Sequence, residues 1–160
     1  MNKLGKIFIV IGILLIIISS SITLINNYED NKAKENSSNI LTVIKNTTIE
    51  PNETNNNSNT ESKIITTTKE TDNTIKINDN NYIGIITIPS LNIELPIMSD
   101  YDYEKLKISP CVYYGKISTN LIICAHSYKS HFGYLSKLNP NDRIIITDVT
   151  GKNYIYEVLE

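Results

Sequence analysis

An uncharged apolar run from Ile7 to Ile25 constrains this chain more than any other feature of its sequence. Coiled as an α-helix, these 19 residues would be about 28 Å long, close to the roughly 30 Å hydrocarbon core of a bilayer. A segment inside lipid must satisfy its own backbone hydrogen bonds, which a helix does. The run therefore predicts one helix that spans a membrane.

The charges on either side of this run predict its orientation. Lys3 and Lys6 precede it, whereas Glu29 and Asp30 follow it. The positive-inside bias puts the N-terminus in the cytoplasm and the rest of the chain outside. A cleaved signal peptide is the alternative, but its apolar region usually has about 7–15 residues, and no Ala-x-Ala site follows this longer run. We therefore expect residues 1–26 to be a retained single-pass anchor in the cell membrane.

Residues 27–80 have the composition of a tether. Asn, Thr, Ser, Lys and Glu dominate, and Asn55–Thr60 is of low complexity. Such a segment buries too little apolar surface to offset the entropy that it would lose on ordering. We expect a disordered tether outside the cell, in which short apolar islands such as Ile40–Ile44 form transient strands or contacts with the following domain.

Residues 81–160 carry the signals of short β-strands separated by turns. The predicted strands are Tyr82–Ile88, Asn92–Ile97, Leu121–His126, Arg143–Thr147 and Tyr154–Leu159. Two short helical segments are predicted at Asp100–Lys107, capped by Asp100 or Asp102, and at His131–Leu138. The spacing favours an all-β barrel or sandwich of about six strands. The last strand would have an unpaired edge, so a closing element is expected beyond Glu160.

The net charge and the two cysteines restrict the classes of function. A formal net charge of −2 argues against nucleic-acid binding, which needs a basic face. Cys111 and Cys124 are too few for a disulfide framework. A single bridge between them is open to an exported domain, although their spacing does not demand it. Cys111 follows Pro110 and is predicted to lie in a loop.

Six segments in the second half of the chain follow one another in an order typical of one protein family. They are Ile83–Pro89, Leu95–Ile97, Asn120–His126, Phe132–Leu135, Asn141–Ile144 and Thr150–Val158. This order resembles that of the sortases, the cysteine transpeptidases of Gram-positive cell surfaces. The family shows a Gly-x-Ile-x-Ile-Pro strand, a Leu-Pro pair and an apolar strand that ends in Gly-His. A Phe-x-x-Leu helix, a Gly-Asp-x-Ile strand and a Gly-x-x-Tyr-x-Tyr-x-Val hairpin follow.

The resemblance implies a fold and a catalytic set. The fold is a closed eight-stranded β-barrel behind an anchor and a stalk. The set is a histidine, a cysteine at the end of the seventh strand and an arginine on the eighth. His126 matches the histidine, whereas the cysteine and arginine strands have no counterpart in these 160 residues. Ala125 and Asn141 stand where the family usually has glycine. We expect an incomplete sortase-type barrel, with about six of eight strands, that is inactive by itself.

The resemblance also implies a reaction and its partners. A sortase cleaves an LPxTG-like sorting signal of a surface protein and transfers the acyl group to an amine of a cell-wall precursor or a pilin. No cofactor or metal is implied. His126 would be the general acid and base of this reaction. The alternative from another class of function is a non-catalytic, membrane-anchored surface module that binds sorting signals or a partner.

The candidate residues have other interpretations as well. His126 alone is typical of a strand-end histidine bonded to the backbone. A dyad of Cys124 and His126 would place side chains ~7 Å apart on one strand, so Cys124 is expected to pack in the core instead. Zinc binding by Cys124, His126 and His131 lacks the paired spacing of structural zinc sites. Arg143 is expected to lie on the surface without a catalytic role.

Overall fold

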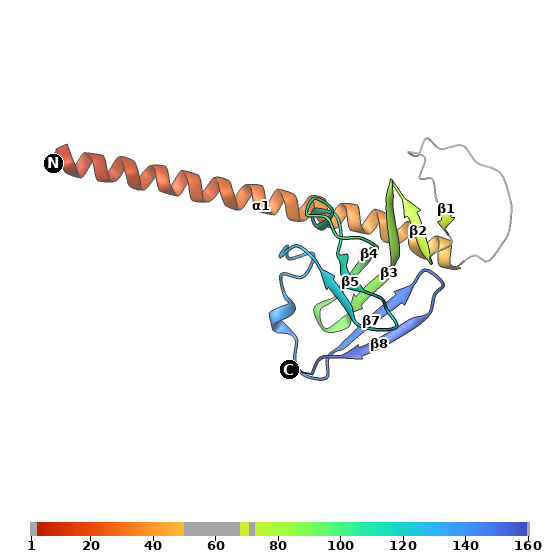
Figure 1. Cartoon of the computed structure of the whole chain (residues 1–160). Helices are drawn as coiled ribbons and strands as arrows, with labels where there is room; N and C mark the ends of the chain where they lie inside the picture. Colours follow the sequence, from red (N-terminus) through yellow and green to blue (C-terminus); the bar gives the residue numbers. More distant parts are fainter. Residues whose placement is uncertain (1–2, 50–67, 71–72, 160) are drawn as a thin grey trace.

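The computed structural model describes residues 3–49, 68–70 and 73–159 of the 160-residue chain. One long helix and a curled β-sheet make up this part (Figure 1). The helix, α1 (Lys3–Ile49), begins far from the sheet and lies along it with its C-terminal part. The predicted anchor Ile7–Ile25 lies inside α1, whose most apolar window is unburied and has a mean hydropathy of 2.8. These properties suit a membrane span, and they would suit an N-terminal signal sequence as well.

The helix continues well past the predicted anchor, so the expectation of a disordered tether is wrong for residues 27–49. The polar composition hides a stripe of small and apolar residues at helical spacing, all of them buried: Ala33, Ser37, Ile40 and Ile44. Their burial against the sheet offsets the entropy that the segment loses on ordering. The expected contacts of Ile40–Ile44 with the later domain are confirmed. Residues 50–67 of the predicted tether lie outside the described residues.

In the described part of the chain, eight strands form one sheet. They are β1 (Thr68–Glu70), β2 (Thr74–Ile77), β3 (Asn80–Ile88), β4 (Ile93–Met98), β5 (Cys111–Gly115), β6 (Leu121–Cys124), β7 (Arg143–Asp148) and β8 (Asn153–Glu157). Their main order is β6-β5-β4-β3-β7-β8, and β2, with β1 beside it, pairs with the first residues of β3. The pair β4–β5 is parallel, and the others are antiparallel.

The curled sheet is a half-barrel in which three of the described strands, β1, β6 and β8, lie at free edges. Among the described strands, β6 pairs only with β5, and β8 pairs only with β7. The unpaired edge expected at the last strand is therefore confirmed. The expectation of an all-β fold holds for the sheet but not for the long helix α1, which covers one of its faces.

All five predicted strands are present, and the sheet contains three that were not predicted. β1 and β2 fall within the predicted tether, where β2 is stabilised by pairing with β3 and β1 by pairing with β2. The prediction of a loop at Cys111 is wrong, because this residue begins β5. Pro110 suggests a turn locally, but Cys111 has the neighbours Met98 and Cys124 in the sheet. The predicted helical segments are single turns of 3₁₀ helix, η2 (Lys105–Lys107) and η3 (Leu135–Lys137).

Two apolar clusters lie on the two faces of the sheet. Along β3, Ile85 belongs to the cluster under α1 and Ile86 to the cluster on the concave face, because successive side chains of a strand alternate. Ile40 and Ile44 of α1 join the first cluster. The second half of the helix is therefore an outer layer of the domain.

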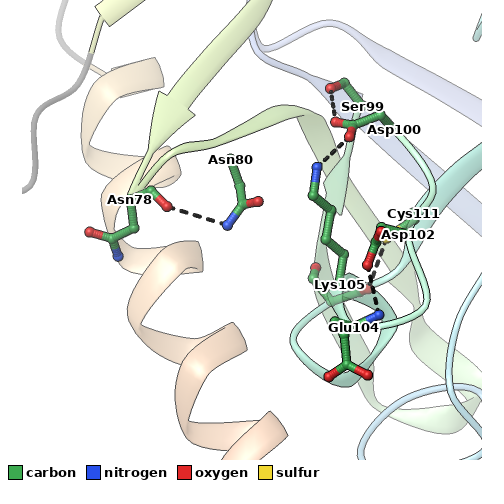
Figure 2. A network of polar contacts seen from close by, with 9 residues as sticks. Asn78, Asn80, Ser99, Asp100, Asp102, Glu104, Lys105 and Cys111 are labelled. Carbon is green, nitrogen blue, oxygen red and sulfur yellow. Dashed lines mark hydrogen bonds and ion pairs between the residues drawn. The ribbon is translucent and has the colours of Figure 1, made fainter.

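A polar network shapes the long connection from β4 to β5 (Figure 2). The carboxylate of Asp100 accepts hydrogen bonds from Lys105 Nζ and from Ser99 Oγ, the latter at 2.9 Å. Asp102 Oδ1 accepts the Glu104 N–H at 2.8 Å, so Asp102 caps the turn that leads into η2. Parallel strands such as β4 and β5 cannot be joined by a tight hairpin, and this network orders the connection between them.

Candidate functional site

The candidate histidine lies just past the end of a strand. β6 ends at Cys124, and His126 is the second residue of the loop that leads to η3. The imidazole is half-buried, and its Nδ1 is buried without a hydrogen-bond partner among the described residues. The ring stacks on Tyr128, with centroids 3.8 Å apart and an interplanar angle of 17°. This stack restricts the orientation of the imidazole plane.

The same loop is bound to the helix α1. The Tyr128 hydroxyl donates to Glu29 Oε2 at 3.0 Å, and the Ser130 N–H donates to Asp30 Oδ1 at 3.0 Å. The Ser130 hydroxyl donates to the same carboxylate. Burial, together with the carboxylate of Glu29, raises the pKa of Tyr128 to about 12, so the phenol keeps its proton and remains a donor. α1 therefore holds the loop that carries His126.

His131 lies at the centre of this contact. Its side chain is fully buried, and its Nε2 lies 3.5 Å from Ser37 Oγ of α1. Ser37 donates its proton to the carbonyl of Ile108 at 2.9 Å, so its oxygen is left to accept from Nε2 of the imidazole. Burial lowers the pKa of His131 to about 4, which keeps the ring neutral at neutral pH.

A tight backbone turn brings these side chains together. The N–H groups of His131 and Gly133 both donate to the carbonyl of Tyr128, at 3.0 and 2.9 Å. A Cβ at position 133 would lie 2.6 Å from the carbonyl oxygen of Ser127, so the turn closes only around glycine. Gly133 therefore has a packing role within the sortase-like segment that contains it.

Sequence reasoning missed Tyr128, Glu29 and Asp30 as parts of this site. Tyr128 lies in a loop without periodicity, and Glu29 and Asp30 stand out in the sequence only as charges beside the apolar run. The position of Tyr128 two residues after His126 is the one local signal that could have been used. The contact itself joins residues 99 positions apart, and no local pattern predicts such a contact.

Neither cysteine has the surroundings of an activated nucleophile. Cys111 is fully buried, and burial is the main reason that its pKa is raised to about 11. It is therefore a protonated thiol at neutral pH. Cys124 is half-buried and packs against the apolar cluster that contains Cys111, so its expected packing role is confirmed. Arg143 is exposed at the start of β7, opposite Glu157, as expected of a surface residue.

The described residues include no group of three or more His, Cys, Asp or Glu side chains that could hold a metal ion. The zinc interpretation of Cys124, His126 and His131 therefore has no support. His131 instead lies between Tyr128 and Ser37, with Nε2 directed at the serine hydroxyl.

The concave face of the sheet surrounds a hollow of about 440 Å³. Its walls are largely apolar side chains of β3, β6, β7 and the loop before η3: Ile86, Ile88, Leu121, Ile123, Phe132, Ile144 and Ile146. Tyr156 of β8 also lines it, so side chains of the two edge strands β6 and β8 both border the hollow. His126 does not line the hollow, but Phe132 of the same loop does.

One family model matches the C-terminal part of the chain. The family model of the sortase domain matches residues 86–160. A search of curated proteins found no match. Residues 86–160 are thus a sortase-type region, and the resemblance inferred from the six sequence segments is confirmed.

Several solved structures are similar to this chain. Sortase C from Clostridium perfringens SM101 is 28% identical over 49% of this chain and 45% of its own, with a TM-score of 0.42. Clostridium perfringens sortase C with the C-terminal cell wall sorting motif is 27% identical over 51% and 48%, with a TM-score of 0.45. Sortase A from Corynebacterium diphtheriae is 28% identical over 51% and 41%, with a TM-score of 0.46. The chain spans less than half of the length of each of these three proteins.

Proposed function

We propose that this chain provides the histidine side of a sortase active site, in which His126 is the general acid and base of an acyl transfer. The observation that carries the proposal is that His126 lies in the matched region 86–160, directly after the strand that precedes the histidine in the family pattern. The stack on Tyr128 supports this role, because a general acid must be held in a defined orientation.

The proposed chemistry has two proton transfers. A cysteine thiolate attacks the carbonyl carbon of the Thr–Gly bond of a sorting signal, and the His126 imidazolium protonates the departing amine. This step leaves a thioester. An incoming amine then attacks the thioester, its proton passes to His126, and the thiolate departs. Both groups are thereby restored without a cofactor.

The thiol of this reaction would belong to a strand with the Thr-x-Thr-Cys pattern of the family, and not to Cys111 or Cys124. Burial keeps Cys111 protonated, although the reaction needs a thiolate. Cys124 packs in the cluster under α1. We therefore expect residues 1–160 by themselves to cleave no sorting signal.

The proposed substrates are surface proteins with an LPxTG-like signal, and the proposed acceptor is an amine of a cell-wall precursor or a pilin. One similar structure, Clostridium perfringens sortase C, contains a C-terminal cell wall sorting motif. The proposed location is the cell membrane, with the N-terminus in the cytoplasm and the sheet outside. The lysines before the apolar part of α1 and the acids after it support this orientation.

A fusion protein tests the role of His126. Residues 1–160 are extended after Glu160 by two strands that carry the family cysteine and arginine, and the protein is assayed in detergent micelles with a fluorogenic LPxTG-type peptide. We expect cleavage by the fusion and none by residues 1–160. We expect His126→Ala to lower the rate of the fusion by at least about 100-fold. Lys129→Ala, an exposed change in the same loop, is the control that should retain the rate.

Persistent cleavage by the His126→Ala fusion would refute the proposed role of the histidine. Cleavage by residues 1–160 that disappears in Cys124→Ala would refute the assignment of the thiol. Peptide binding by residues 1–160, measured by fluorescence anisotropy and unchanged by His126→Ala, together with a folded but inactive fusion, would favour the non-catalytic surface module.

A further inference from the structure

The two cysteines of the chain face each other across one rung of the sheet. Cys111 is the first residue of β5, and its register partner is Cys124, the last residue of β6. The strands are antiparallel, and the Cα atoms of directly opposite residues in such a ladder are about 4.5–5.5 Å apart. A disulfide needs a Cα separation of roughly 4.4–6.8 Å. The register of the two strands therefore gives Cys111 and Cys124 a Cα–Cα separation that a disulfide can bridge.

Both cysteine side chains also lie on the same face of the sheet. Cys124 packs against the apolar cluster that contains Cys111. The next rung, Val112 with Ile123, packs against the cluster on the concave face. The β-bulge in this ladder comes after Val112, so it leaves the alternation at the cysteine rung undisturbed.

From this register we infer that Cys111 and Cys124 form a disulfide bond when the sheet meets a disulfide oxidant outside the cytoplasm. Both thiols are free in the structure, and Sγ of Cys111 donates a weak hydrogen bond to the Ser109 carbonyl at 3.5 Å. Rotation about the Cα–Cβ bond of Cys111 releases this contact and turns Sγ toward Cys124. The inference depends on export of the sheet and not on the proposed acyl transfer.

Two thiol–disulfide exchanges would form the bridge. The half-buried Cys124 reacts first, because its thiolate can reach a small-molecule or protein disulfide and displace one thiolate from it. The Cys111 thiolate then attacks Sγ of Cys124 and displaces the second thiolate. The two cysteine thiols lose two protons and two electrons, which convert the oxidant disulfide into two thiols. Burial raises the pKa of Cys111 to about 11, so the second exchange is the slower step.

The bridge would reinforce a weakly attached part of the sheet. β5 joins β4 through one register pair, Met98 with Cys111. β6 has β5 as its only partner among the described strands. A covalent link between the start of β5 and the end of β6 lowers the entropy of the unfolded chain and fixes the point where the chain enters the His126 loop.

Oxidised glutathione added to the purified full chain in detergent micelles tests the inference. The expected product is a monomer that is lighter by two hydrogen atoms and has no free thiol after denaturation. Trypsin cleaves after Lys107, Lys116 and Lys129, so the bridge should link peptide 108–116 to peptide 117–129. The Tm of the oxidised chain should exceed that of the reduced chain by about 5–10 °C.

Two variants and a denatured sample are the controls. Cys111→Ala and Cys124→Ala should each keep one thiol and show no redox-dependent shift of Tm. The wild type is also titrated with mixtures of oxidised and reduced glutathione. The ratio of oxidised to reduced glutathione at which half of the chains carry the bridge should be at least about tenfold lower for the folded chain than for the chain in urea. The reason is that a bridge which stabilises the folded state is, by the same factor, easier to form in the folded state. Free thiols, glutathione adducts or disulfide-linked dimers as the main folded product would overturn the inference. Equal ratios in the folded chain and in urea would overturn it as well.

Discussion

The two histidines of this chain lie in one loop but differ in their surroundings. His126 is half-buried and stacked on Tyr128, whereas His131 is fully enclosed between that tyrosine and α1. Asp30 favours the protonated form of His131 and His126 disfavours it, but burial is the largest influence and lowers its pKa. The neutral imidazole is therefore part of the packing between the loop and the helix.

Acid should weaken the fold through His131. Its pKa is about 4 in the folded chain and returns to its ordinary 6.5 on unfolding, so the unfolded chain binds more protons between these pH values. The free energy of unfolding should therefore fall as the pH is lowered from 6.5 to 4, by up to about 3 kcal/mol. Urea unfolding, followed by the fluorescence of the ten tyrosines, measures this change because the chain has no tryptophan.

Two substitutions separate this effect from other titrations. His131→Gln cannot be protonated and should lose most of the pH dependence, whatever its stability at pH 7. His126→Gln removes the other histidine and should keep the dependence. If acid lowers the free energy of unfolding equally in the wild type and in His131→Gln, another group is responsible for the pH dependence.

The surroundings of the helix α1 differ along its length. From Ile7 to Leu24 its large apolar side chains are exposed on the protein, as a segment in lipid requires. From Ala33 to Ile44 it is amphipathic and buries one stripe against the sheet. Between these parts, Glu29 and Asp30 bind the loop of the candidate histidine. One element therefore serves as the predicted anchor, as an outer layer of the domain and as a support for His126.

Removal of apolar surface from the second half of α1 should destabilise the domain. Ile44 is 1% exposed and packs against side chains such as Ile75 and Tyr82. Ile44→Ala leaves a cavity there and should lower the free energy of unfolding by about 2–4 kcal/mol. Asn46→Ala, an exposed change on the same helix, should change it by less than about 0.5 kcal/mol. Similar values for the two variants in urea unfolding would mean that α1 does not pack on the sheet in solution.

The whole molecule combines an apolar helix with a half-barrel that has free edges at β6 and β8. Side chains of both edge strands border the apolar hollow of the sheet. The N-terminal part of α1, which contains the predicted anchor, extends away from the sheet (Figure 1). This arrangement suits a domain held close to a membrane by a rigid helix, which replaces the flexible tether expected for residues 27–49.

The anchor prediction can be tested with two charges in the centre of the apolar run. Leu14→Arg with Ile16→Arg should release the chain from washed membranes, because each arginine costs about 2.5–3.5 kcal/mol at the centre of a spanning helix. Leu14→Phe with Ile16→Phe should remain bound. An epitope before Met1 should stay on the membrane-bound polypeptide, and its loss by cleavage would identify a signal sequence instead.

Local patterns were sufficient for much of the fold. The length of the apolar run predicted the first part of α1, and alternation between turn residues predicted five of the eight strands that the structure describes. Each of the six short segments can be recognised from a few adjacent residues. Their order predicted the sortase resemblance and the role of His126. These features are encoded over distances of four to twenty residues, where helix period, strand period and turn chemistry operate.

The remaining features depend on contacts between distant parts of the chain. The second half of α1 is helical because the sheet buries its one narrow stripe. β5 forms because it pairs with β6 from Cys111 to Gly115 and with β4 at Cys111. The pairing of Cys111 with Cys124 and the contact of Glu29 with Tyr128 are set by strand register and helix packing. Spacing along the chain does not encode such contacts, because the burial that stabilises each residue comes from partners that only the folded chain brings near.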